Sequence, residues 1–113
     1  MRCENETTEV LQRAKRIITE EVEKASCRVV KVILFGSRAR GDARADSDWD
    51  FLVVVDRDIP PAVRREISGE TSVHLVRHGI VADILVHSLS VMAAHQDDVG
   101  HIAYYALKEG AEV

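Results

Sequence analysis

The chain has 113 residues, a net charge of −4 and a sequence pI of about 5.7. Its length predicts one domain over residues 1–113, and its acidic balance excludes broad, sequence-independent binding to nucleic acid, which depends on surplus Lys and Arg. No apolar run approaches the ~20 residues of a membrane span, and the polar start of the chain is unlike a signal peptide. We therefore expect a cytoplasmic protein with no membrane partner, in which Cys3 and Cys27 are reduced.

The first half of the chain predicts a helix, a strand, a loop and a second strand. Apolar residues recur every three or four positions over residues 6–26, which predicts an amphipathic helix. Residues 29–35, VVKVILF, are β-branched and apolar and predict a buried strand. Residues 37–47 are polar without an apolar period and are expected to form a loop or one short helix. A second strand is expected over residues 48–55, DWDFLVVV.

The second half of the chain predicts further helices around a third strand. A proline pair begins a helix expected over residues 60–77, and residues 80–87, IVADILVH, predict the strand. A helix capped by Ser88 or Ser90 and another over residues 101–108 follow. This order predicts the α/β (α+β) class, with a small mixed β-sheet flanked by helices.

Two carboxylates, Asp48 and Asp50, begin the second predicted strand. Side chains alternate along a strand, so both point to one face, roughly 6.6–6.8 Å apart, while Trp49 points into a core. Neighbouring carboxylates repel each other unless a cation or free solvation relieves them, and Mg²⁺ prefers oxygen ligands of this kind. The pair is therefore a candidate metal site.

Asp83 is an acid inside the otherwise apolar third strand, where it is costly without a partner. If the second and third strands are neighbours, Asp83 can stand on the same face as Asp48 and Asp50. Three carboxylates on adjacent strands form a metal cup of the kind used for phosphoryl and nucleotidyl transfer. His87 lies four positions further along and can share this face, although a surface or strand-end histidine is the more common case.

A Gly36-Ser37 pair follows the first predicted strand and is a candidate phosphate-binding turn. Glycine allows a close backbone approach, and the Ser37 hydroxyl with neighbouring N–H groups can hold phosphate oxygens. Arg38, Arg40 and Arg44 add positive charge, and Arg38 or Arg40 is a candidate for stabilising a transition state. Each feature alone is commonly a plain turn, a solvated loop or an exposed arginine. Their order and spacing together favour a nucleotide site.

The spacing of these motifs resembles the GS-x10-DxD signature of the polymerase-β-like nucleotidyltransferase superfamily. GS at 36–37 is followed after ten residues by DWD at 48–50. The strings GSRARG and SDWDF are similar to the minimal nucleotidyltransferase branch almost letter for letter. Asp83 falls where the family has its third acid, and the resemblance covers about residues 8–110.

This resemblance implies a small mixed-sheet nucleotidyltransferase that transfers AMP from ATP with two Mg²⁺ ions. Members of similar size act as antitoxins beside a HEPN-domain toxin, in some cases by adenylylating a tyrosine of that partner, which implies a hetero-oligomer. The implied catalytic and metal-binding residues are Asp48, Asp50 and Asp83. The implied nucleotide-binding residues are Gly36, Ser37, Arg38 and Arg40.

Two other functions stay open from the sequence. One is a non-catalytic antitoxin that neutralises a HEPN toxin by direct contact, and the other is a small-molecule nucleotidyltransferase. The complete acidic trio favours catalysis over the binding module. The short chain leaves no residues for an acceptor-binding domain, so we expect the acceptor pocket at an interface with a partner. The chain departs from the family at residues 111–113, where a longer hydrophobic strand is common.

Overall fold

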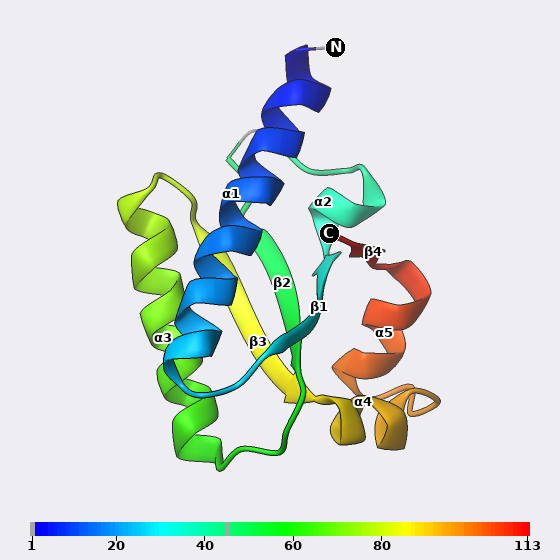
Figure 1. The fold of residues 1–113 in the computed structure, drawn as a ribbon. Helices are drawn as coiled ribbons and strands as arrows, with labels where there is room; N and C mark the ends of the chain where they lie inside the picture. Colours follow the sequence, from blue (N-terminus) through cyan, green and yellow to red (C-terminus); the bar gives the residue numbers. More distant parts are fainter. Residues whose placement is uncertain (1, 45) are drawn as a thin grey trace.

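The computed structural model describes residues 2–44 and 46–113, with side chains described from residue 7 onward within these ranges. The sheet has the strand order β3-β2-β1-β4, in which β1 is antiparallel to β2 and β4, and β2 is parallel to β3 (Figure 1). This arrangement confirms the predicted class, a small mixed sheet flanked by helices. Along the chain the elements are α1 (Arg2–Lys24), β1 (Val29–Phe35), α2 (Ser37–Arg40), β2 (Trp49–Val55), α3 (Pro61–Arg77), β3 (Ala82–Ser88), α4 (Leu89–His95), α5 (Ile102–Glu109) and β4 (Ala111–Glu112).

The observed bounds differ from the predicted ones by a few residues at most. The strand over residues 29–35 is confirmed as β1, whereas α1 begins four residues before and ends two residues before the helix expected over residues 6–26. β3 begins at Ala82, two residues later than expected. The reason is local, because the Ile80 N–H donates back to the Leu75 carbonyl (2.9 Å) and so belongs to the end of α3.

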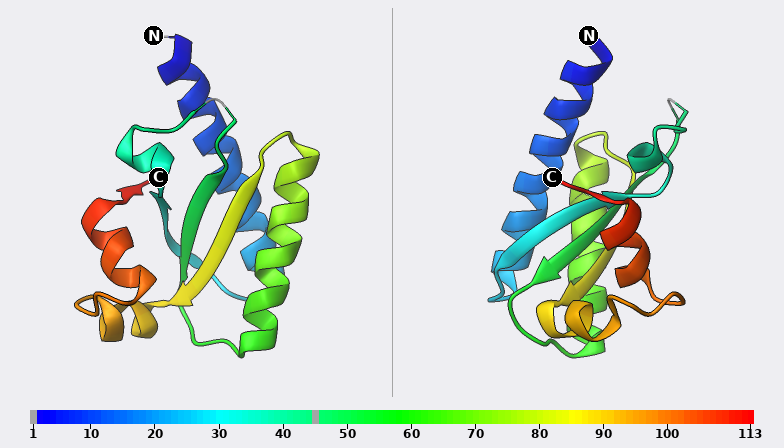
Figure 2. Two further views of the ribbon diagram at one scale, coloured as in Figure 1. Left: turned by 180° about the vertical axis from the view of Figure 1, so that it is seen from behind. Right: turned by 90° about the vertical axis from the view of Figure 1, so that its right-hand side faces the viewer.

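Helices cover both faces of the sheet and form two apolar layers (Figures 1 and 2). The larger layer lies between the sheet and the pair α1 and α3, and the smaller one lies against α4 and α5. The predicted placement of Trp49 in a core is confirmed, and alternate positions of β2 face the larger layer: Trp49, Phe51, Val53 and Val55. Leu52 and Val54 face the smaller layer, so β2 is buried on both sides. Asp50 shares the face of Leu52 and lies nearer the start of the strand.

The chain ends in a short strand at the edge of the sheet. Ala111 pairs with Leu34, and Glu112 pairs with Ile33. Gly110 permits this approach, because a Cβ at that position would lie only 2.5 Å from the Ile33 side chain. Among the described helices, none is both long and apolar enough to cross a membrane. Cys27 is buried and free, and Cys3 lies outside the residues whose side chains are described.

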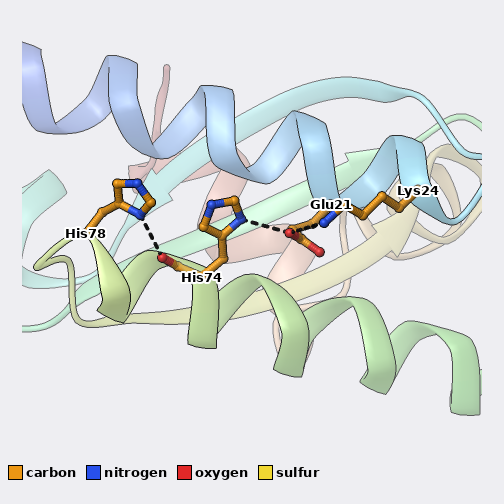
Figure 3. A network of polar contacts seen from close by, with 4 residues as sticks. All are labelled: Glu21, Lys24, His74 and His78. Atoms are coloured by element: carbon orange, nitrogen blue, oxygen red, sulfur yellow. Dashed lines mark hydrogen bonds and ion pairs between the residues drawn. The ribbon is translucent and has the colours of Figure 1, made fainter.

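A buried carboxylate joins the two long helices of the larger layer (Figure 3). Glu21 of α1 is 8% exposed, and it accepts hydrogen bonds from Lys24 Nζ (3.0 Å) and from His74 Nδ1 of α3 (2.8 Å). His78 Nδ1 in turn contacts the His74 carbonyl at 3.1 Å. Burial by itself raises the pKa of Glu21, but the hydrogen bonds and charges of Lys24 and His74 outweigh it and hold this pKa below its ordinary value. The folded state therefore favours the ionised form of Glu21.

We expect Glu21→Gln to lower the free energy of unfolding at pH 7 by about 1–2 kcal/mol, or ~4–8 °C in Tm, since charge-assisted hydrogen bonds are lost. The pKa of Glu21 is lowered on folding, so its stabilisation is present above the ordinary value of 4.5 and is lost as the pH falls through the folded pKa. Thermal unfolding between pH 7 and pH 3 should show the two Tm values converging at the acidic end. The exposed neighbour provides the control variant Glu20→Gln, and an equal effect of both substitutions would contradict this assignment.

Candidate active site

The predicted contact between acids of neighbouring strands is confirmed. β2 and β3 pair in parallel, and Asp50 is directly in register with Asp83. Their side chains leave the same face of the sheet, and the two carboxyl groups are close enough to share a hydrogen bond. Asp48 lies one residue before β2 begins, and both Asp48 and Asp83 are exposed. The structure therefore joins Asp50 and Asp83 as a pair and places Asp48 beside it on an adjoining segment.

The surroundings of Asp50 disfavour its ionised form. Burial raises the pKa of Asp50 above its ordinary value of 3.8, and the charges of Asp83 and Asp48 raise it further. A hydrogen bond with Asp83 acts in the same direction, whereas the charge of Arg40 opposes the rise. Three ionised carboxylates at this place are an unfavourable arrangement that a bound cation would relieve.

The donor set fits a hard divalent cation that completes its coordination with other ligands. Mg²⁺ is commonly held by one or two carboxylates together with substrate phosphates and water. Asp50 and Asp83 supply such a pair, and Asp48 adds negative charge from nearby. Among the side chains that the structure describes, in residues 7–44 and 46–113, no group of three or more His, Cys, Asp or Glu is already gathered as a metal-binding cluster. Coordination of the metal by all three acids stays a prediction. Phosphate oxygens of the nucleotide would have to complete the coordination shell.

The predicted Gly36-Ser37 turn lies against Asp50. Phe35, the last residue of β1, pairs with Asp50, so the chain leaves the sheet next to that carboxylate. Gly36 has φ 76° and ψ −158°, a backbone conformation that is essentially restricted to glycine. A Cβ at this position would overlap the carboxylate of Asp50. Glycine therefore provides both the backbone conformation and the space that the acid needs.

Ser37 begins the short helix α2 beside the acids. The Gly36 carbonyl accepts hydrogen bonds from the N–H groups of Ala39 and Arg40, both at 3.1 Å. The N–H groups of Ser37 and Arg38 come before these bonds and lie at the start of the helix. N–H groups at such a start, together with a serine hydroxyl, are donors suited to phosphate oxygens. Phosphate donors and carboxylates thus meet at one end of the sheet.

The two predicted nucleotide-binding arginines have different surroundings. Arg38 donates from Nε and Nη2 to the Ser47 carbonyl at 3.0 and 2.6 Å, and its guanidinium lies 4.0 Å from the centre of the Trp49 ring. Arg40 is exposed, and its positive charge acts on Asp50. The contact between Arg38 and Trp49 was not predicted from the sequence. The available signal was the position of an aromatic residue, Trp49, between two acids.

His87 shares the face of Asp83 but lies near the other end of β3. Its ring centre is 5.2 Å from that of His101, which stacks on His95 at 4.2 Å. Burial, together with the charges of Arg64, His101 and His95, holds the pKa of His87 below its ordinary value. His87 is therefore part of the packing between β3 and the helical segments that follow it.

A serine-containing turn beside carboxylates on two neighbouring strands is typical of enzymes that bind a nucleoside triphosphate with divalent metal. The small mixed sheet positions both parts of this site. The chain belongs to the nucleotidyltransferase family, since residues 11–98 match the sequence model of the family described as "Nucleotidyltransferase domain". The family predicted from the GS-x10-DxD spacing is thereby confirmed.

Two known proteins are similar to the chain. One, from Methanocaldococcus jannaschii, is named "Putative protein adenylyltransferase MJ0604" and is 38% identical over 61 residues, which make up 54% of this chain and 56% of that protein. The chain thus spans about half the length of this curated relative. The other is a solved structure described as "Crystal structure of the toxin-antitoxin with AMP-PNP", with a TM-score of 0.56 and 17% identity over 86% of this chain and 69% of that chain. At that identity the likeness shows a shared fold.

Proposed function

We propose that this protein is an Mg²⁺-dependent adenylyltransferase that transfers AMP from ATP to a hydroxyl group of a partner protein. The observation that carries the proposal is the register of Asp50 with Asp83, next to the Gly36-Ser37 turn. Membership of the nucleotidyltransferase family and the likeness to a protein named as an adenylyltransferase support this reaction.

In this proposal, the triphosphate of ATP lies between the turn and the acids. The Ser37 hydroxyl and the N–H groups at the start of α2 would hold the β- and γ-phosphates, and Asp48, Asp50 and Asp83 would hold two Mg²⁺ ions. Bound Mg²⁺ supplies positive charge for the departing pyrophosphate and lowers the pKa of the acceptor hydroxyl. The acceptor hydroxyl would give up its proton to water as its oxygen bonds to the α-phosphorus. The bond from the α-phosphorus to the oxygen that bridges it to the β-phosphorus would break at the same time, and pyrophosphate would leave with that electron pair. Arg40 stabilises the negative charge that develops on the phosphates.

We further propose that the acceptor is a tyrosine of a HEPN-domain toxin and that the chain is its antitoxin in the cytoplasm. A solved structure with the same fold is described as a toxin-antitoxin with AMP-PNP, which supports a toxin as the partner. Asp48 and Asp83 are exposed, so a side chain of a partner protein has access to the acids. Adenylylation within a hetero-oligomer would then neutralise the toxin.

A growth assay that co-expresses the HEPN partner separates catalysis from simple binding. We expect the wild type to restore growth, as should Asp97→Asn, which changes an exposed acid outside the site. Asp50→Asn and Asp83→Asn should fail to restore growth while still capturing the partner in a pull-down. Full neutralisation by both variants would refute the catalytic proposal and favour the non-catalytic binding module.

A further inference from the structure

One side chain of α2 holds the residues on both sides of Asp48. Arg38 donates two hydrogen bonds to the Ser47 carbonyl, and its guanidinium lies over the Trp49 ring. Ser47 and Trp49 are the immediate neighbours of Asp48 in the chain. We propose that Arg38 is a positioning residue, which fixes the place of Asp48 in the active site. Its catalytic consequence rests on the function proposed above.

Asp48 needs such support because the sheet does not hold it directly. Asp50 is paired with Phe35 on one side and with Asp83 on the other, so two neighbouring strands fix its backbone. Asp48 comes one residue before β2 and is exposed. Backbone hydrogen bonding to the segment that leads into β3 starts at the next residue, where the Trp49 N–H donates to the Val81 carbonyl (3.0 Å). The separation of Asp48 from Asp50 therefore depends on how its two neighbours are held.

The contacts of Arg38 suit a rigid support. Trp49 is 8% exposed and stacks on Phe51 with an angle of 3° between the rings, so the surface that receives the guanidinium is fixed in the core. A planar guanidinium can donate twice to one carbonyl and lie flat on an aromatic ring at once. A lysine ammonium retains the charge and loses this geometry, so Arg38→Lys is an informative substitution.

The direction of the guanidinium separates this role from that of a nucleotide ligand. Trp49 faces the larger apolar layer, whereas Asp50 and the residues that follow it at alternate positions face the other side of the sheet. Arg38 follows Ser37 directly, so one residue connects the phosphate-binding turn to the segment that carries Asp48. Arg38 thereby sets the spacing between the phosphate donors and the first acid.

The test measures binding of AMP-PNP by calorimetry, with Mg²⁺ and with EDTA, and needs no partner protein. In Arg38→Met the Mg²⁺ concentration for half-maximal binding should rise about 10-fold, the usual effect of losing a residue that orients a metal ligand. Binding in EDTA should change less than about 2-fold, and Arg38→Lys should resemble Arg38→Met. In an Asp48→Asn background Arg38→Met should add little, because both substitutions act on the same ligand. The control is Arg65→Met, an exposed arginine on α3.

Trp49 also provides a readout that does not depend on metal, because it is the only tryptophan in the sequence. In Arg38→Met, acrylamide should quench the Trp49 fluorescence more strongly, because the ring is more accessible, while the circular dichroism spectrum stays unchanged. Weaker AMP-PNP binding in EDTA, with unchanged Mg²⁺ dependence, would overturn the inference and make Arg38 a nucleotide ligand. Unchanged quenching would show that Arg38 does not cover the Trp49 ring. If the wild type binds no Mg²⁺-nucleotide at all, the proposed function fails, whereas the quenching result still decides whether Arg38 holds Trp49.

Discussion

Replacing Asp50 with Asn should greatly slow transfer and, in the metal-free protein, raise the stability. Loss of a central carboxylate is expected to lower the rate of transfer on the order of 10³-fold, because the charge that holds the metal is removed. The same carboxylate is unfavourable in the free protein, since burial and the charges of Asp83 and Asp48 raise its pKa. We therefore expect the free energy of unfolding to increase by about 1 kcal/mol at pH 7, or ~4 °C in Tm.

The stability difference between wild type and Asp50→Asn should depend on pH. A pKa raised on folding means that the folded protein binds the Asp50 proton more tightly than the unfolded chain does. The destabilisation of the folded state by Asp50 is therefore absent below the ordinary pKa of 3.8, and it grows as the pH rises through the folded pKa. Thermal unfolding of wild type and Asp50→Asn in EDTA should show similar Tm values at acidic pH and a more stable variant at pH 7. A variant less stable than wild type at pH 7 would contradict this account of the site.

Replacing Gly36 with Ala should damage the site more than the fold. An alanine must adopt a backbone conformation that is essentially restricted to glycine, at a cost of roughly 1–3 kcal/mol. Its Cβ would also overlap the Asp50 carboxylate, so that the acid is displaced. A displacement of about 1 Å at a reacting centre is sufficient for a loss on the order of 10²-fold in the rate of transfer. Steady-state transfer and thermal unfolding measure the two effects separately.

Gly79 offers a matched control for Gly36. It also has a positive φ, 77°, but a Cβ there would meet no atom within 4 Å. Gly79→Ala should therefore lose stability through backbone strain alone and keep its transfer rate, when both are measured below the Tm of each variant. Equal losses of transfer in the two variants would show that Gly36 acts only through general stability.

The local elements and the position of the acids were predictable because they depend on neighbouring residues. The apolar run VVKVILF fixed β1, and the alternation in β2 placed Trp49 and Asp50 on opposite faces. The contact between Asp50 and Asp83 was only conditional, because a sequence does not state which strands are neighbours. The connection through α3 makes β2 and β3 parallel neighbours and satisfies that condition.

Contacts across space could not be predicted in the same way. Sequence alternation assigned one buried face to β2, but Leu52 and Val54 also became buried when α4 and α5 packed over them. The direction of Arg38 was not predictable either, because a long side chain on a helix of only four residues can adopt many rotamers. Its partners, Ser47 and Trp49, are nine and eleven residues away in the chain and come close only after the segment folds back.

The central claim is tested most directly by incubating the purified protein with ATP labelled in its α-phosphate, Mg²⁺ and the HEPN partner. We predict that one AMP is transferred to a tyrosine of the partner, that EDTA prevents the transfer, and that Asp50→Asn does not support it whereas Asp97→Asn does. Mass spectrometry of the partner would locate the modified residue. Label that remains entirely in ATP with the wild-type protein, while the toxin is nevertheless neutralised, would contradict the account and leave neutralisation by binding alone.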